Sequence, residues 1–161
     1  MKNANIPLWK QTILNNISVG SGSGFSGWTA SSGVNSIIAN NGTGNIASGD
    51  FSIAGGYLNN AYGNQSFIGG GTGNITSGFN SSILAGASNK AIGNNASVVG
   101  GFLNIASGNQ TIIGGGAYNN TSGLYSSILG GYKNSAVTNY TSVLGGYQNL
   151  AKGNQSVVVG G

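Results

Sequence analysis

An asparagine recurs every 15 residues along most of this chain, and the residues around it repeat in the same register. The asparagines are Asn59, Asn74, Asn89, Asn104, Asn119, Asn134 and Asn149. With each asparagine as position 1 of a repeat, position 10 is always isoleucine or valine, position 3 is alanine or threonine, and position 13 is glycine. Position 5 is glycine except at Thr138. In a β-solenoid each residue stacks on its counterpart about 4.8 Å away, which requires such a fixed period. The chain is therefore predicted to be all-β, a parallel β-solenoid with about 15 residues per coil.

The chain divides into two parts. Residues 1–35 contain a mixed segment around Trp9 and a Gly/Ser-rich stretch around Trp28, which we interpret as an N-terminal attachment or capping segment followed by a loop. Residues 36–161 form the predicted solenoid domain. Asn45 lies one residue out of frame, so we expect a distorted first coil, as terminal repeats often are.

The predicted strand at positions 8 to 13 is apolar or glycine on both faces, so both faces should be covered. Positions 9 and 11 share one face and exchange bulk: Phe67 and Ile112 accompany glycines, whereas serines at position 9 accompany Leu84, Val99, Leu129 and Leu144. Only Val157 with Val159 departs from this exchange. Constant volume along a face is typical of a packed interface. A thin coil cannot cover this face itself, which favours a cyclic homo-oligomer.

Composition excludes most catalytic sites. The chain has no histidine or cysteine and one side-chain carboxylate, Asp50. The chain therefore lacks the side chains needed for an acid/base pair, for a cysteine or serine/histidine nucleophile, or for a metal cage. We expect no enzyme activity, cofactor or metal. Five scattered lysines form no stripe, so nucleic-acid binding is not expected. The N-terminus lacks a secretory h-region, and no apolar run could insert in a membrane as a helix.

The S-[IV]-[IL]-x-G-G-x-x-N-x-A-x-G pattern over about residues 36–161 resembles the head repeats of trimeric autotransporter adhesins (YadA-like heads) and related phage tail and head fibres. The resemblance implies a left-handed β-roll, assembled as a homotrimer with the S-[IV]-[IL]-x-G strand towards the trimer axis, and a role in attachment to a host surface. The 15-residue period departs from the shorter coil of about 14 residues that is commoner in that family. The coiled-coil stalk and anchor barrel of a complete autotransporter are not present in the sequence.

Three columns are candidate sites. The asparagine column is interpreted as a buried structural ladder of turn amides rather than a ligand site. The serine and threonine column at position 8 is a weak candidate for an ice-binding face. Outer aromatic residues are the candidate receptor contacts, because aromatic rows on an amide-rich surface suit sugar rings. They are Tyr57, Phe102, Tyr118, Tyr132 and Tyr147. The competing interpretation is that these aromatics pack at a protomer boundary or over a turn.

The first hypothesis is a structural and adhesive fibre protein on a virion surface, attached to other virion proteins through residues 1–35. It would act as a homotrimer that binds a host-surface glycan. The alternative is a head fragment of a bacterial trimeric autotransporter adhesin at the cell surface. A signal peptide, stalk and anchor barrel encoded around the chain would favour this alternative. A third hypothesis, an ice-binding solenoid, would be tested by thermal hysteresis.

Overall fold

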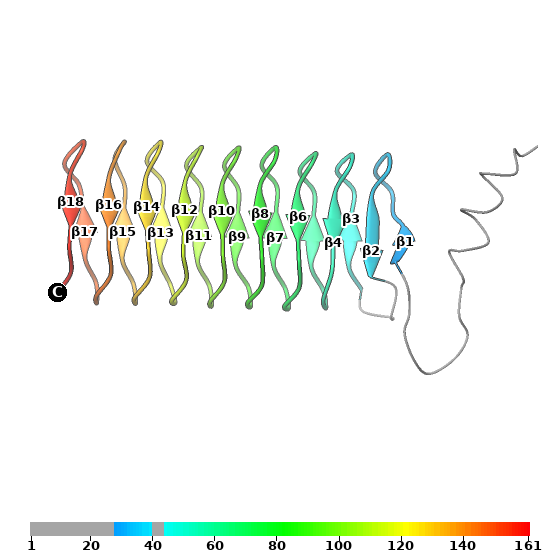
Figure 1. Cartoon of the computed structure of the whole chain (residues 1–161), viewed down its shortest axis with the longest axis horizontal. Coiled ribbons are helices and arrows are strands. Elements are labelled where there is room, and N and C mark those ends of the chain that lie inside the picture. Colours follow the sequence, from blue (N-terminus) through cyan, green and yellow to red (C-terminus); the bar gives the residue numbers. More distant parts are fainter. Residues whose placement is uncertain (1–27, 40–43) are drawn as a thin grey trace, which may run out of the picture.

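The computed structural model describes residues 28–39 and 44–161, and these residues form a long stack of two-layered coils (Figure 1). Residues 1–27 of the predicted attachment segment and loop lie outside the described residues. The described chain makes about eight turns with about 15 residues per turn, so the predicted β-solenoid is confirmed. No helix in this described part is long and apolar enough to cross a membrane.

The coils build two sheets. The ten-stranded sheet contains β1 (Trp28–Ala30), β2 (Ile37–Ala39), β4 (Ile53–Ala54), β6 (Phe67–Ile68), β8 (Ser82–Ile83), β10 (Ser97–Val98), β12 (Ile112–Ile113), β14 (Ser127–Ile128), β16 (Ser142–Val143) and β18 (Val157–Val158). The eight-stranded sheet contains β3 (Ile46–Ala47), β5 (Asn60–Ala61), β7 (Ile75–Thr76), β9 (Lys90–Ala91), β11 (Ile105–Ala106), β13 (Asn120–Thr121), β15 (Ser135–Ala136) and β17 (Leu150–Ala151). From β2 onwards the chain alternates between the two sheets, one strand of each per coil (Figure 1).

Pairing between coils is parallel and follows the sequence repeat. Val98 of β10 pairs with Ile113 of β12, and Ala106 of β11 pairs with Thr121 of β13. Each residue therefore contacts its own counterpart in the next coil, which explains why whole columns of the sequence share one residue type.

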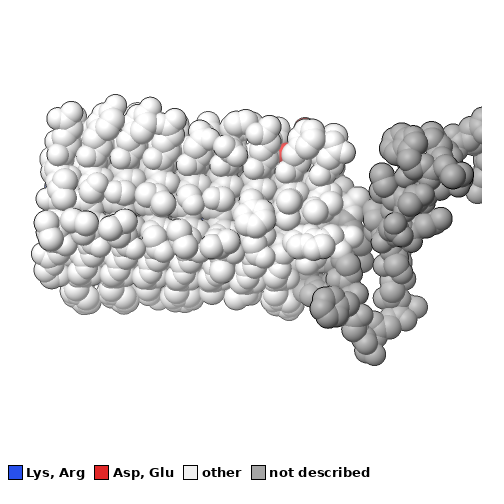
Figure 2. All heavy atoms as spheres, viewed as in Figure 1, with Lys and Arg blue, Asp and Glu red and all other residues white. Residues whose placement is uncertain are grey.

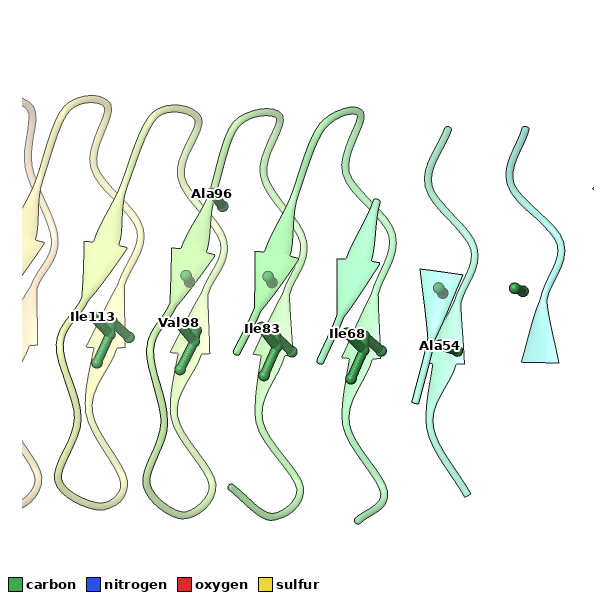
Figure 3. Close-up of a cluster of buried hydrophobic side chains, with 10 residues drawn as sticks. Ala54, Ile68, Ile83, Ala96, Val98 and Ile113 are labelled. Atoms are coloured by element: carbon green, nitrogen blue, oxygen red, sulfur yellow. The ribbon is translucent and has the colours of Figure 1, made fainter. Parts of the chain in front are cut away.

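The core is a narrow line of side chains between the layers. Position 10 of the ten-stranded sheet contributes isoleucine or valine, and position 3 of the eight-stranded sheet contributes alanine or threonine; both columns are buried over the regular coils. Figure 3 shows Ile68, Ile83, Val98 and Ile113 at the same level of successive coils, inside the space between the sheets. A bulky column facing a small one fills this thin space without a void.

Glycine at position 5 allows the coils to approach closely at one turn. A Cβ on Gly63, Gly78 or Gly93 would overlap the backbone of the following coil, at Gly78, Gly93 and Gly108 respectively. The φ angles there are not in the left-handed region, so the glycine is needed for space rather than for backbone conformation.

The N-terminal end differs from the sequence-based prediction. Part of the segment predicted to be a loop forms β1, which pairs antiparallel with β2 and places Trp28 opposite Ala39. A terminal strand such as β2 offers backbone groups to any adjacent segment, and even a Gly/Ser-rich segment can use them. The Gly33–Ser36 turn already repeats the regular turns, because Ser36 N–H donates to Gly33 O over 3.2 Å as Ser52 N–H does to Gly49 O.

The out-of-frame Asn45 lies inside the solenoid. Its Oδ1 accepts the N–H of Asn59 over 2.9 Å, although the two residues are 14 apart rather than 15. Its Nδ2 donates to Gly56 O over 2.7 Å. This coil is one residue shorter before its glycine turn, because Asn45 reaches Gly56 O, 11 residues later, whereas Asn59 reaches Gly71 O, 12 residues later. The distortion therefore leaves the asparagine column intact.

Candidate binding surface

The asparagine column is buried and fully used by the fold. Asn104 Nδ2 donates to the carbonyls of Gly100 and Gly116 over 3.0 and 2.9 Å. Its Oδ1 accepts the backbone N–H of Asn119 over 3.0 Å and the side-chain amide of Asn119 over 3.1 Å. The other asparagines of the column repeat most of these bonds, with small differences between coils. Each amide thus joins its own turn to the next coil, and the column from Asn59 to Asn134 exposes nothing to a ligand.

The hydroxyl column at position 8 is also internal. Ser81, Thr111 and Ser126 are buried, and each hydroxyl donates to a glycine carbonyl three residues earlier over 2.8 Å. These hydroxyls hold the turn at position 5 and offer no array to ice. Asparagines at position 6 have a similar role at the surface, which the sequence did not indicate: Asn109 Oδ1 accepts the Asn94 N–H over 2.9 Å.

Four of the five candidate receptor residues meet in one continuous line, here called the aromatic row: Phe102, Tyr118, Tyr132 and Tyr147. Ring centroids are separated by 5.6 Å between Phe102 and Tyr118, 5.4 Å between Tyr118 and Tyr132, and 5.5 Å between Tyr132 and Tyr147. The four side chains are between 36% and 59% exposed. Tyr57 is exposed as well but stands apart, because Thr72 and Ala87 occupy the intervening places in its column.

The backbone explains why residues from two positions join the same row. Phe102, Tyr132 and Tyr147 belong to position 14, which forms a parallel bridge column between the sheets. Tyr118 belongs to position 15 and has φ 59°, in the left-handed region. This conformation costs a non-glycine residue about 1–2 kcal/mol. The Tyr118 N–H donates to Phe102 O in the preceding coil over 3.0 Å, which offsets part of that cost.

A second aromatic pair lies at the opposite edge of the coils. Tyr125 and Tyr140 stack with centroids 5.1 Å apart and planes 6° apart. Both occupy position 7, in the connection from the eight-stranded to the ten-stranded sheet, and both have positive φ. This pair spans two coils only, whereas the aromatic row spans four.

The outward side of the ten-stranded sheet is apolar, and we call it the outer face. It presents eight apolar side chains that are between 38% and 77% exposed: Phe67, Leu84, Val99, Ile112, Leu129, Leu144, Val157 and Val159. At Gly69 a Cβ would lie 2.6 Å from the Leu84 carbonyl oxygen of the next coil and 3.2 Å from the Phe67 ring, so both the backbone and the bulky neighbour favour glycine there. Residues 28–39 and 44–161 do not supply the predicted cover over this face.

Charge is sparse on the described surface. Figure 2 shows one face of the solenoid with almost no charged atoms. Beside the aromatic row, the Lys133 ammonium lies 5.2 Å from the centre of the Tyr132 ring, a contact that the sequence columns did not indicate. Asp50 lies far along the chain, and its carboxylate accepts the Val34 N–H over 2.9 Å.

The surface therefore offers stacking, hydroxyl groups and one cation, and within the described residues no three potential metal-binding side chains of the His, Cys, Asp or Glu type come together. The sequence matches no protein-family model and no curated protein.

Proposed function

We propose that the protein is a non-enzymatic structural and adhesive fibre protein of the phage tail or head fibre type, in which three copies associate through their outer faces. It acts on a virion surface, and the row of coils holds binding side chains away from the particle. The apolar outer face carries this proposal. Monomeric soluble proteins rarely expose an apolar stripe that runs the length of a domain.

The chemistry of the outer face favours a second and third copy of the same chain as its partner. Its large side chains are apolar, the serines between them bond one another as Ser127 and Ser142 do, and its volume per coil is nearly constant. A straight, parallel partner with the same repeat would therefore fit along its length. Closed rotational symmetry buries one patch of every copy without leaving a free end. Three copies around an axis would thus give the thin protomers a shared second core.

Two other functions remain as alternatives with the same fold. The head of a bacterial trimeric autotransporter adhesin would use the same outer face, so the fold does not separate it from a virion fibre. An ice-binding solenoid is disfavoured by one observation, the burial of the hydroxyl column whose hydroxyls bond the turns.

Light scattering tests the assembly. At micromolar concentration we expect a mass three times the 15.9 kDa of one chain. Leu129→Asp is expected to dissociate this trimer, because it would place a charge in a dry interface, where burial of an unpaired charge is very costly.

Val137→Asp is the matched control. Val137 is also apolar and exposed, but it directly follows β15 of the eight-stranded sheet, away from the outer face. This variant should remain trimeric. A wild-type protein that is a stable monomer, or two variants that dissociate alike, would reject the proposed assembly.

A further inference from the structure

We propose that the aromatic row and Lys133 together bind an elongated acidic polysaccharide that lies parallel to the solenoid axis. This inference rests on the proposed adhesive function and names the class of its ligand: a chain of sugar rings that carries carboxylates.

The first support is the spacing of the rings. Each of four consecutive coils contributes one ring, and the three centroid separations lie between 5.4 and 5.6 Å. Successive pyranose rings of an extended polysaccharide advance by a similar length, so one sugar can meet one aromatic ring over several coils. The direction of the row fixes the direction of the ligand along the solenoid.

The second support is the state of the ring faces. Phe102 with Tyr118, and Tyr118 with Tyr132, meet at 85° and 64°, and an edge-to-face contact leaves one face of a ring free. Tyr132 and Tyr147 instead stack with planes 7° apart, so each turns one face towards the other and keeps its other face and its edge for a ligand. Tyrosine side chains lose little conformational entropy on binding, and their hydroxyl groups can bond sugar hydroxyls. The row thus combines apolar faces with polar edges, as a sugar surface does.

The third support is that the fold does not need aromatic residues at these places. Equivalent positions in the preceding coils hold Thr72 and Ala87 at position 14, and Gly73 and Ser88 at position 15. Thr72 and Ala87 pair in the same bridge column as the aromatics of position 14, and the Ser88 N–H donates to the preceding coil as the Tyr118 N–H does. The aromatic row is therefore an addition to one part of the solenoid surface, and a binding role explains it better than a packing role.

The charge of the ligand follows from Lys133. Its ammonium stands beside the Tyr132 ring, and Asp50, the only side-chain carboxylate of the chain, lies several coils away. A ligand carboxylate placed over the row would meet this cation and no repelling acidic side chain. The next coil has Gln148 at the equivalent place, which can bond the ligand but adds no charge.

The test uses the trimeric full chain and two probes of one skeleton: an oligogalacturonate of at least four sugars and its fully methyl-esterified, neutral form. Binding is measured by titration calorimetry at low salt. We expect the acidic probe to bind several-fold more tightly, and a single galacturonate to bind far more weakly than the oligomer. Tyr132→Ala with Tyr147→Ala should weaken both oligomers about tenfold, since two stacking contacts are lost. Alanine already occupies position 14 at Ala87 and Ala117, so the fold should persist.

Two controls separate the parts of the proposal. Tyr125→Gln with Tyr140→Gln removes a stacked pair at the opposite edge of the coils and should leave binding unchanged. Glutamine is the natural residue at this position in two other coils, at Gln65 and Gln110. Lys133→Gln, with the residue of Gln148, should abolish only the preference for the acidic probe. Lys90→Asn removes one charge at a position away from the aromatic row, where another coil has Asn60, and should preserve that preference.

The proposal is overturned if neither oligomer binds the trimer, if the aromatic double change leaves binding intact, or if Lys133→Gln retains the preference for the acidic probe. None of these outcomes changes the light-scattering mass, so failure of the glycan site is distinguishable from failure of the proposed trimer.

Discussion

Gly93→Ala is expected to lower the free energy of unfolding by about 3 kcal/mol or more, the upper range for overpacking in a tight site. The new methyl group would overlap the carbonyl of Gly108 and lie 2.9 Å from the backbone nitrogen of Asn109. These are backbone atoms of the next coil, so no side-chain rotation can relieve the overlap. Urea denaturation at fixed protein concentration, followed by circular dichroism, measures the change.

Gly115→Ala is the matched control. A Cβ at Gly115 would meet nothing within 4 Å, and the same position holds alanine at Ala85. Its stability should change by no more than about 0.5 kcal/mol. Equal effects of the two substitutions would show that the coils are not stacked in this register.

Asn104→Ala is the second change with a large expected effect, a loss of about 3 kcal/mol. It removes an amide that makes four hydrogen bonds and deprives the buried Asn119 N–H and the Gly100 carbonyl of the partner they have in the fold, while the Gly116 carbonyl still accepts the Phe102 N–H over 3.0 Å. The same denaturation experiment measures it.

Asn109→Ala makes the identical chemical change at an exposed asparagine. Asn109 Oδ1 accepts a single bond, from the Asn94 N–H, and water can replace it there. Its cost should stay below about 1 kcal/mol. A loss as large as that of Asn104→Ala would mean that burial does not determine the strength of the ladder.

The repeat alone predicted the parts of the fold that depend on columns. A 15-residue period with β-branched, small and glycine columns leaves few alternatives to stacked coils, and the β-branched column correctly indicated a core at Ile113. The close approach of successive coils at Gly93 was seen only in the structure. The same logic gave the buried role of Asn104, since an asparagine repeated in every coil suits a ladder of stacked turn amides.

Features that depend on backbone conformation were less predictable. Positions 7 and 15 are left-handed at residues such as Gln110 and Leu103, with φ 56° and 53°, although the residue types give no such signal. The reason is tertiary: each N–H there donates to the preceding coil, as Gln110 N–H does to Asn94 O over 2.8 Å. The continuity of the aromatic row depends on this conformation at Tyr118, so the sequence named its members but not their contact.

The start of the solenoid was misjudged for a related reason. Composition favoured a loop around Trp28, because glycine and serine are poor strand formers. The strand β1 forms because β2 would otherwise be an uncovered edge, and the composition around Trp28 carries no sign of the neighbouring β2.

Site-specific cross-linking tests the central claim, that three copies meet through their outer faces. The chain contains no cysteine, so Ser127→Cys places a single thiol on the outer face. Ser122→Cys places a single thiol at an exposed position directly after β13 of the eight-stranded sheet. With a short bis-maleimide at low protein concentration, the account predicts covalent dimers from Ser127→Cys and none from Ser122→Cys. Cross-linking of neither variant, or of both to the same extent, would contradict it.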